Sequence, residues 1–169
     1  TVTFLPQSYS VNLFLRDAVQ ATAAMWYNEY HTILSAGYDP EELTTFRFSD
    51  HGLDLPEDGI YTLARTLARN PALCRDFVRA SLAGWQYAFA HEDEALDIVL
   101  ARMESAHVPA NRAHQRWMLR AIKTLMRFDH DGNIACTLNP ADYNGVAALL
   151  QRDDATLQPP DFTAFHHPA

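Results

Sequence analysis

Basic residues are scarce in this sequence, where 13 Lys and Arg stand against 21 Asp and Glu, giving a net charge of −8 at pH 7. A nucleic-acid partner is therefore not expected, because phosphate neutralisation needs clustered Lys and Arg. The densest basic group has helical spacing, which is typical of the solvated face of an amphipathic helix; it comprises Arg112, Arg116, Arg120, Lys123 and Arg127. No apolar run is long enough to span a bilayer.

Cysteine is also rare. The two cysteines, Cys74 and Cys136, lie far apart and match no metal-ligand spacing. One disulfide and two buried thiols are both open interpretations, and neither residue carries the signature of a nucleophile. No secretory leader precedes the apolar segment that follows Thr1, which suggests a processed or truncated chain.

Complete catalytic and metal-binding motifs are absent, as are glycine-rich phosphate loops. His91-Glu92 lacks the second histidine of a zinc-protease helix, because residue 95 is Ala. The segment 129–133 has the beginning of a calcium loop, but its glycine comes one residue early and its twelfth position lacks Glu, so we predict a helix-ending turn. The consecutive Ser49-Asp50-His51 does not fit the geometry of a catalytic triad. We therefore expect no enzymatic activity, no cofactor and no metal.

Strand-like and helix-like segments alternate in the first part of the chain. At 169 residues and 48% hydrophobic, the chain can form one domain or part of a larger one. Short apolar segments predict strands at 2–5, 20–25, 44–48 and 59–63, with helices at 11–15 and 27–36 between them. This alternation predicts an α/β fold with a mainly parallel sheet.

From residue 70 onward the pattern is almost entirely helical, and the predicted helices cover 70–88, 92–103, 111–128 and 139–150. Asn70-Pro71 and Asn139-Pro140 each place a capping residue before a proline, which is typical of a helix start. Asp39-Pro40 begins one helical turn in the same way. The helix from residue 70 is apolar on two faces, which predicts deep burial.

The segment 20–31 is the strongest functional signal. Its small apolar residues end in three aromatic side chains together with Asn28 and Glu29. Ligands of α/β sheets bind beyond the carboxyl ends of the strands, so we expect Trp26, Tyr27, Asn28 and Glu29 to face a small ligand. The alternative is that the aromatic residues pack into the core and Glu29 begins a helix.

Three motifs resemble the periplasmic substrate-binding proteins of ABC transporters, specifically the family related to thiamine-pyrimidine-precursor binding. Residues 70–88, which read NPALCRDFVRASLAGWQYA, are similar to that family's patterned helix. Residues 25–30, MWYNEY, are similar to its MtYNEY motif, and residues 51–59, HGLDLPEDG, are similar to its crossover segment. Leu138–Tyr143 also fits the family's closing helix.

The resemblance implies a type II periplasmic-binding-protein-like fold, an α/β architecture with two lobes and the ligand between them. Residues 1–48 correspond to part of the second lobe, residues 49–63 to the interlobe crossover, and residues 64–169 to the helical C-terminal part that completes the first lobe. The chain is thus similar to the C-terminal half of a family member, and the expected partners include the missing N-terminal half of the same protein. The implied location is periplasmic, or extracellular and lipid-anchored.

The implied function is a solute-binding component that delivers a small heteroaromatic ligand, similar to the thiamine pyrimidine, to the membrane permease of an ABC transporter. In this interpretation Trp26 and Tyr27 stack on the ring, Glu29 accepts paired N–H bonds and Asn28 fixes the ligand's orientation. Further candidate ligand-binding residues are Gln7 and Ser8, after the first predicted strand, and Asp50, at the crossover.

Two alternatives stay open. One is a ligand-sensing domain of a membrane-anchored signalling protein. The other is an enzyme similar to thiamine-pyrimidine synthases, but those relatives carry a cysteine-rich cluster near the crossover, where this chain has Gly52-Leu53-Asp54-Leu55-Pro56. That departure favours binding over catalysis.

Overall fold

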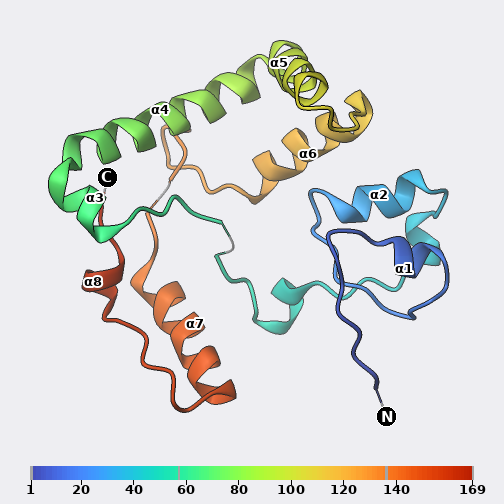
Figure 1. Ribbon diagram of the computed structural model, residues 1–169, viewed down its shortest axis with the longest axis horizontal. Coiled ribbons are helices and arrows are strands. Elements are labelled where there is room, and N and C mark those ends of the chain that lie inside the picture. The colour runs from blue at the N-terminus through green and yellow to red at the C-terminus, as the bar shows by residue number, and fades with distance from the viewer. Residues whose placement is uncertain (1, 57, 136, 169) are drawn as a thin grey trace. The chain divides into compact units, whose positions relative to one another are not determined.

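The computed structural model describes residues 2–56, 58–135 and 137–168, and the fold of these residues is helical (Figure 1). The helices are α1 (Asn12–Leu15), α2 (Glu29–Ser35), α3 (Ala64–Arg69), α4 (Pro71–Ala90), α5 (Glu92–Ser105), α6 (Arg112–Leu125), α7 (Pro140–Asp153) and α8 (Phe162–Phe165), with two 3₁₀ turns, η1 (Pro40–Glu42) and η2 (Phe48–His51). None of the helices in the described part of the chain is long and apolar enough to cross a membrane.

The predicted α/β fold is wrong, and with it the type II two-lobed architecture. None of the segments 2–5, 20–25, 44–48 and 59–63 forms a strand, and the β-structure of the described residues is one isolated bridge between Phe128 and Ile134. A strand requires a neighbouring strand for its backbone N–H and C=O groups, and these short segments do not pair with one another. Their apolar side chains stay exposed instead; Phe4, for example, keeps 89% of its surface accessible.

Most helix starts agree with the sequence prediction. The Asn70 side chain accepts a hydrogen bond from the Leu73 N–H at 3.2 Å, and the Asn139 side chain accepts one from the Ala141 N–H at 2.8 Å. At η1 the Glu42 carboxylate accepts a hydrogen bond from the Asp39 N–H at 2.9 Å. These starts were predictable because capping depends on residues within one helical turn.

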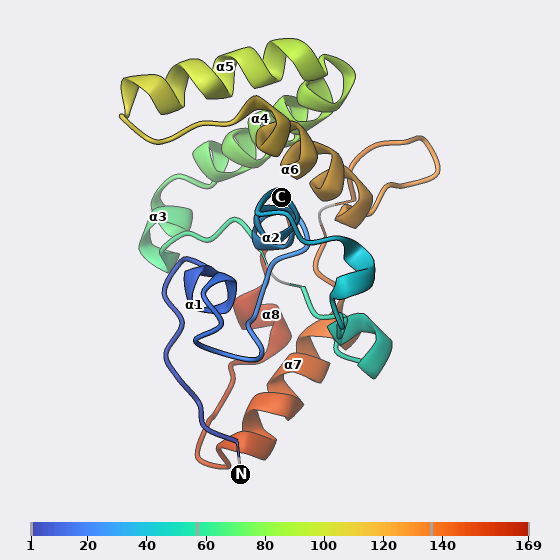
Figure 2. The same ribbon diagram turned by 90° about the vertical axis from the view of Figure 1, so that its right-hand side faces the viewer.

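The described residues divide into two compact units, and α4 contributes to both. The first unit comprises Thr1–Thr44 and Trp85–Arg127. In it, α2 and α5 both pack against α6, as Figure 2 shows. The buried hydrophobic residues of the described chain all belong to this unit; they are Val11, Ile33, Leu96 and Ala121.

The second unit comprises Thr45–Gly84 and Phe128–Ala169. In it, α8 packs against α7, where the Tyr143 hydroxyl donates a hydrogen bond to the Pro160 carbonyl at 2.6 Å. The lobe boundaries predicted at residues 48 and 63 stay predictions.

The expected deep burial of α4 is wrong. No residue of this helix is buried, and Leu73 and Phe77 keep 55% and 59% of their surface accessible. The apolar pattern predicts which faces favour burial, but burial also needs a packing partner along the helix. Cys74, on this helix, is a half-buried free cysteine, and Cys136 lies outside the described residues.

Candidate functional site

Four of the predicted ligand-binding residues lie together at the start of α2. Trp26, Tyr27 and Asn28 precede the helix, Glu29 is its first residue, and all four side chains are half-buried. The strand predicted at 20–25 is wrong, because the segment before Trp26 has no regular secondary structure. That these four residues face a ligand stays a prediction.

An aromatic cluster joins α2 to α6. The Trp26 ring stacks on the Tyr30 ring with centroids 4.6 Å apart, and the Trp117 ring of α6 lies 6.0 Å from Trp26 and 6.4 Å from Tyr30. The Trp117 indole N–H donates a hydrogen bond to the Trp26 carbonyl at 3.2 Å. Because one residue supplies both a ring contact and a hydrogen bond, Trp117 fixes the backbone as well as the side chain of the segment that precedes α2.

Asn28 and Glu29 form a short polar chain beside these rings. The Glu29 carboxylate accepts a hydrogen bond from the Met25 N–H at 3.0 Å and another from the Asn28 side-chain amide at 3.3 Å. The Asn28 side-chain oxygen lies 2.9 Å from Nε2 of His114 on α6. A carboxylate has about four acceptor positions. Glu29 therefore keeps acceptor capacity for a ligand after these two bonds.

Two histidines, His31 and His114, lie in contact beside Asn28. Nδ1 of His31 lies 2.9 Å from Nδ1 of His114, and the His31 ring stacks on the Trp117 ring with centroids 4.9 Å apart. Burial, and then the neighbouring His114, lower the pKa of His31 below its ordinary value. The neutral form of His31 is thus favoured where α2 touches α6.

The other three predicted residues have different surroundings. Gln7 lies in the first unit, and its side-chain amide pairs with the backbone of Ala23, donating to its carbonyl at 2.9 Å and accepting from its N–H at 3.1 Å. Ser8 is exposed, and its carbonyl accepts a hydrogen bond from the Ser10 N–H at 2.7 Å. Asp50 belongs to the second unit, on η2, where its carboxylate accepts a hydrogen bond from the Ser49 hydroxyl at 3.4 Å.

Sequence reasoning did not select four residues of this site: Tyr30, His31, His114 and Trp117. The last two are three residues apart on α6, a spacing that places them on the same face of a helix, and this was the available signal. Nothing in the sequence indicated that this face would meet α2, because the two segments are more than 80 residues apart.

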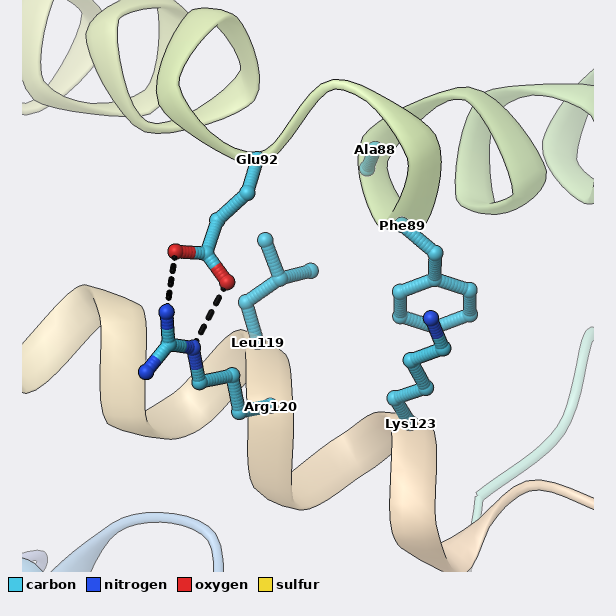
Figure 3. Close-up of a pocket in the computed structure, with 6 residues that line it drawn as sticks. All are labelled: Ala88, Phe89, Glu92, Leu119, Arg120 and Lys123. Carbon is cyan, nitrogen blue, oxygen red and sulfur yellow. Dashed lines mark hydrogen bonds and ion pairs between the residues drawn. The ribbon is translucent and has the colours of Figure 1, made fainter.

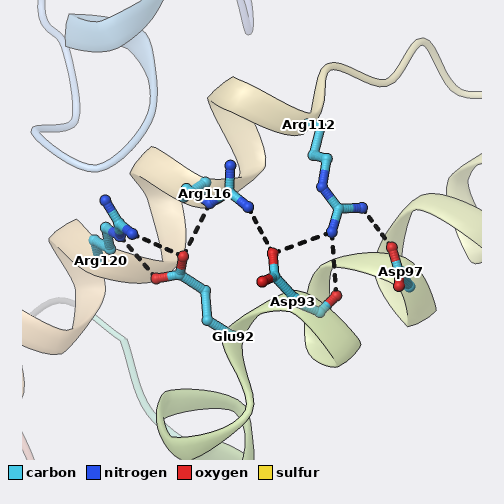
Figure 4. Close-up of polar contacts among 6 residues, drawn as sticks. All are labelled: Glu92, Asp93, Asp97, Arg112, Arg116 and Arg120. Carbon is cyan, nitrogen blue, oxygen red and sulfur yellow. Dashed lines mark hydrogen bonds and ion pairs between the residues drawn. The ribbon is translucent and has the colours of Figure 1, made fainter.

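The basic face predicted for residues 112–127 is in part an ion-pair network with α5 (Figure 4). Arg120 donates two hydrogen bonds to the Glu92 carboxylate, at 2.7 and 2.8 Å, and Arg116 bridges Glu92 at 2.9 Å and Asp93 at 2.6 Å. Arg112 pairs with Asp93 and Asp97. These contacts hold α5 on α6, and they occupy guanidinium groups that an anionic ligand would otherwise need.

A pocket of about 210 Å³ lies between the end of α4, the start of α5, and α6 (Figure 3). Ala88, Phe89, Glu92, Leu119, Arg120 and Lys123 line this pocket. None of the seven predicted ligand-binding residues is among them. The Lys123 ammonium lies over the Phe89 ring, 5.6 Å from its centroid. This volume is below the usual range of about 300–1,000 Å³ for ligand sites. We take the aromatic cluster as the candidate site because four of the predicted residues lie there.

In the part of the chain that the structure describes, no three His, Cys, Asp or Glu side chains are grouped so that they could hold a metal ion. The chemistry available at the start of α2 is therefore ring stacking together with hydrogen bonds from and to Asn28, Glu29 and the two histidines.

A comparison with family models matches the family described as NMT1/THI5 like over residues 1–95, which is more than half of the chain. The chain belongs to the NMT1/THI5-like family. This confirms the recognition made from the motifs at residues 25–30 and 70–88. No curated protein matches the chain, and no solved structure matches it.

The NMT1/THI5-like family is generally one of binding proteins, and it also has a synthase-like member. Binding of a small molecule follows from membership at this coarse level. The matched segment includes Trp26, Tyr27, Asn28 and Glu29, whereas His114 and Trp117 lie beyond it. The site therefore combines residues of the matched segment with two residues of α6 that the match does not cover.

Proposed function

We propose that this protein binds a small heteroaromatic ligand, similar to the thiamine pyrimidine, as the solute-binding component of an ABC transporter. The observation that carries the proposal is the NMT1/THI5-like match over residues 1–95, which contains the aromatic and polar residues at the start of α2. The proposed partners are the membrane permease and an N-terminal half of the same protein. The proposed location is periplasmic, or extracellular and lipid-anchored.

The chemistry of the cluster fits such a ligand. Trp26 and Tyr27 are half-buried aromatic residues, suited to stacking on a flat ring. The Glu29 carboxylate can accept the paired N–H bonds of an aminopyrimidine edge, and a hydrogen bond to an ionised group is stronger than a neutral one. The Asn28 side chain is oriented by its hydrogen bonds with Glu29 and His114, and it would fix the orientation of the bound ligand.

We expect an aminopyrimidine to raise the thermal midpoint of the chain. A ligand present at 100 times its dissociation constant stabilises the folded state by about 2.7 kcal/mol. Differential scanning fluorimetry with a panel of aminopyrimidines measures this shift, and native mass spectrometry gives the stoichiometry. No shift with any member of the panel would exclude this ligand class.

The variant Glu29→Gln should lose the ligand-induced shift, because the amide replaces one acceptor oxygen by an NH2 donor and loses the negative charge, so it cannot accept paired N–H bonds side by side as the carboxylate does. The matched control is Glu41→Gln, which changes an exposed carboxylate of the same unit whose side chain makes no hydrogen bond within the described residues. Circular dichroism at pH 7.5 checks that both variants fold. An unchanged shift in Glu29→Gln would contradict the assigned role.

A further inference from the structure

The contact between His31 and His114 has definite proton positions. The Asn28 amide nitrogen donates to Glu29, so the Asn28 oxygen faces His114 and must accept from His114 Nε2–H. A neutral His114 then has a bare Nδ1, and the proton between the two rings belongs to His31 Nδ1. The Ser35 hydroxyl, 3.3 Å from the same His31 nitrogen, can only accept from it.

This arrangement accommodates one additional proton but not two. A first proton can bind Nε2 of His31 and leave the bond between the two Nδ1 atoms intact. A second proton would have to bind Nδ1 of His114, which would then stop accepting the bond from His31. Two positive rings with centroids 5.1 Å apart would also repel each other.

Other charged groups near the pair are already paired. On α2, Glu29 is bonded to the Met25 N–H and to Asn28, and the Tyr30 ring stacks on Trp26. On α6, the basic residues on either side of His114 are Arg112 and Arg116, which are bonded to carboxylates of α5. Among the described residues, the two histidines therefore contact each other, and their further neighbours are neutral. These are Ser35 and Asn28, within hydrogen-bond distance, and the Trp117 ring.

We propose that the His31–His114 pair is a proton-dependent latch, which holds α2 on α6 until both rings are positively charged and then releases it. Release would also free Asn28 from His114 and separate Trp26 from Trp117, because these contacts join the same two segments. The further consequence, that acidification weakens ligand binding, rests on the proposed function.

The sign of the pH effect follows from proton counting. The pKa of His31 in the packed state is lowered from 6.5, so the released state binds more protons than the packed state. The packed state is therefore stabilised fully above pH 6.5, and this stabilisation decreases as the pH falls below that value. The first proton, on His31, is disfavoured by burial, and the second breaks the bond between the two rings.

Hydrogen exchange of the full chain tests the latch directly. Between pH 7.5 and pH 5.0, exchange in peptides covering α2, corrected for the intrinsic rate, should rise by up to about tenfold for each pH unit below 6.5 and for each extra proton bound. In His31→Gln, whose side-chain amide can still donate to His114, this rise should be at least halved. His130→Gln is the matched control, because the His130 side chain is 88% exposed and pairs only with Asp131 among the described residues.

Two results would overturn the latch: corrected exchange in α2 of the natural chain that does not change with pH, or an equal rise in His31→Gln. If His31→Gln is unfolded at pH 7.5 by circular dichroism, His114→Gln provides the same comparison.

Calorimetric titration with an aminopyrimidine at pH 7.5 and pH 5.5 separates the two proposals. If α2 exchange depends on pH but no aminopyrimidine binds, the latch stands and the proposed function fails. If an aminopyrimidine binds and α2 exchange does not depend on pH, the latch fails and the proposed function stands.

Discussion

At the scale of single residues, the Gln7 side chain makes the backbone hydrogen bonds that a neighbouring strand would make in a sheet. Its amide both donates to and accepts from the backbone of Ala23, the pattern that a neighbouring antiparallel strand would supply. The same amide oxygen also accepts a hydrogen bond from the Thr22 hydroxyl at 3.0 Å. A side chain predicted to contact ligand is therefore engaged with the segment that leads to α2.

We expect Gln7→Ala to lower the free energy of unfolding by about 1 kcal/mol, because a hydrogen bond contributes about 0.5–1.5 kcal/mol and water can replace part of these exposed bonds. Urea denaturation measures the change. Gln20→Ala is the control, since the Gln20 side chain is exposed and forms no hydrogen bond within the described residues. Equal effects of the two substitutions would contradict this role for Gln7.

At the scale of elements, ion pairs join α5 and α6, and each guanidinium of α6 pairs with one or two carboxylates of α5 (Figure 4). The bonds from Arg120, and then from Arg116, lower the pKa of Glu92 below 4.5. The bonds from Arg116 and then Arg112 lower the pKa of Asp93 below 3.8. Because Asp93 is exposed and Glu92 is half-buried rather than buried, the network fixes the pairing of the two helices more than it adds stability.

The network predicts a loss of stability in acid. A carboxyl group with a lowered pKa stabilises the folded state above its ordinary pKa, and this contribution is lost as the pH falls through the lowered value. We expect the urea midpoint of the natural chain to fall below pH 4.5, and Glu92→Gln to reduce this fall. Glu104→Gln, an exposed residue of α5 without a side-chain hydrogen bond in the described part of the chain, should follow the natural chain. A Glu92→Gln curve that matches the natural chain would exclude this role of the network.

At the scale of the whole molecule, the family match and the first compact unit end at different residues. The match ends at residue 95, but the first unit continues to Arg127 and includes α6. Helix α2 has seven residues, and helices shorter than about 12 residues are marginal in water without tertiary packing. The candidate site at the start of α2 therefore depends on residues beyond the matched segment.

A chain truncated after residue 110 should lose the order of α2, since it lacks α6. We expect hydrogen exchange of α2 peptides in this chain to approach the intrinsic rate at pH 7.5. A chain truncated after residue 127, where the first unit ends, should keep the protection of the full chain. Retained protection in the shorter chain would show that α6 does not stabilise α2.

The sequence determined the features that depend on neighbouring residues. The capped starts of α4 and α7, the turn at Asp39, and the grouping of Trp26, Asn28 and Glu29 each depend on side chains within one or two helical turns. The motifs also identified the family. The predicted sheet was wrong because strand pairing depends on segments far apart in the chain, and alternating apolar segments do not reveal whether a partner exists. Only the tertiary structure decided that α2 meets α6, and it thereby placed His114 and Trp117 beside residues more than 80 positions earlier.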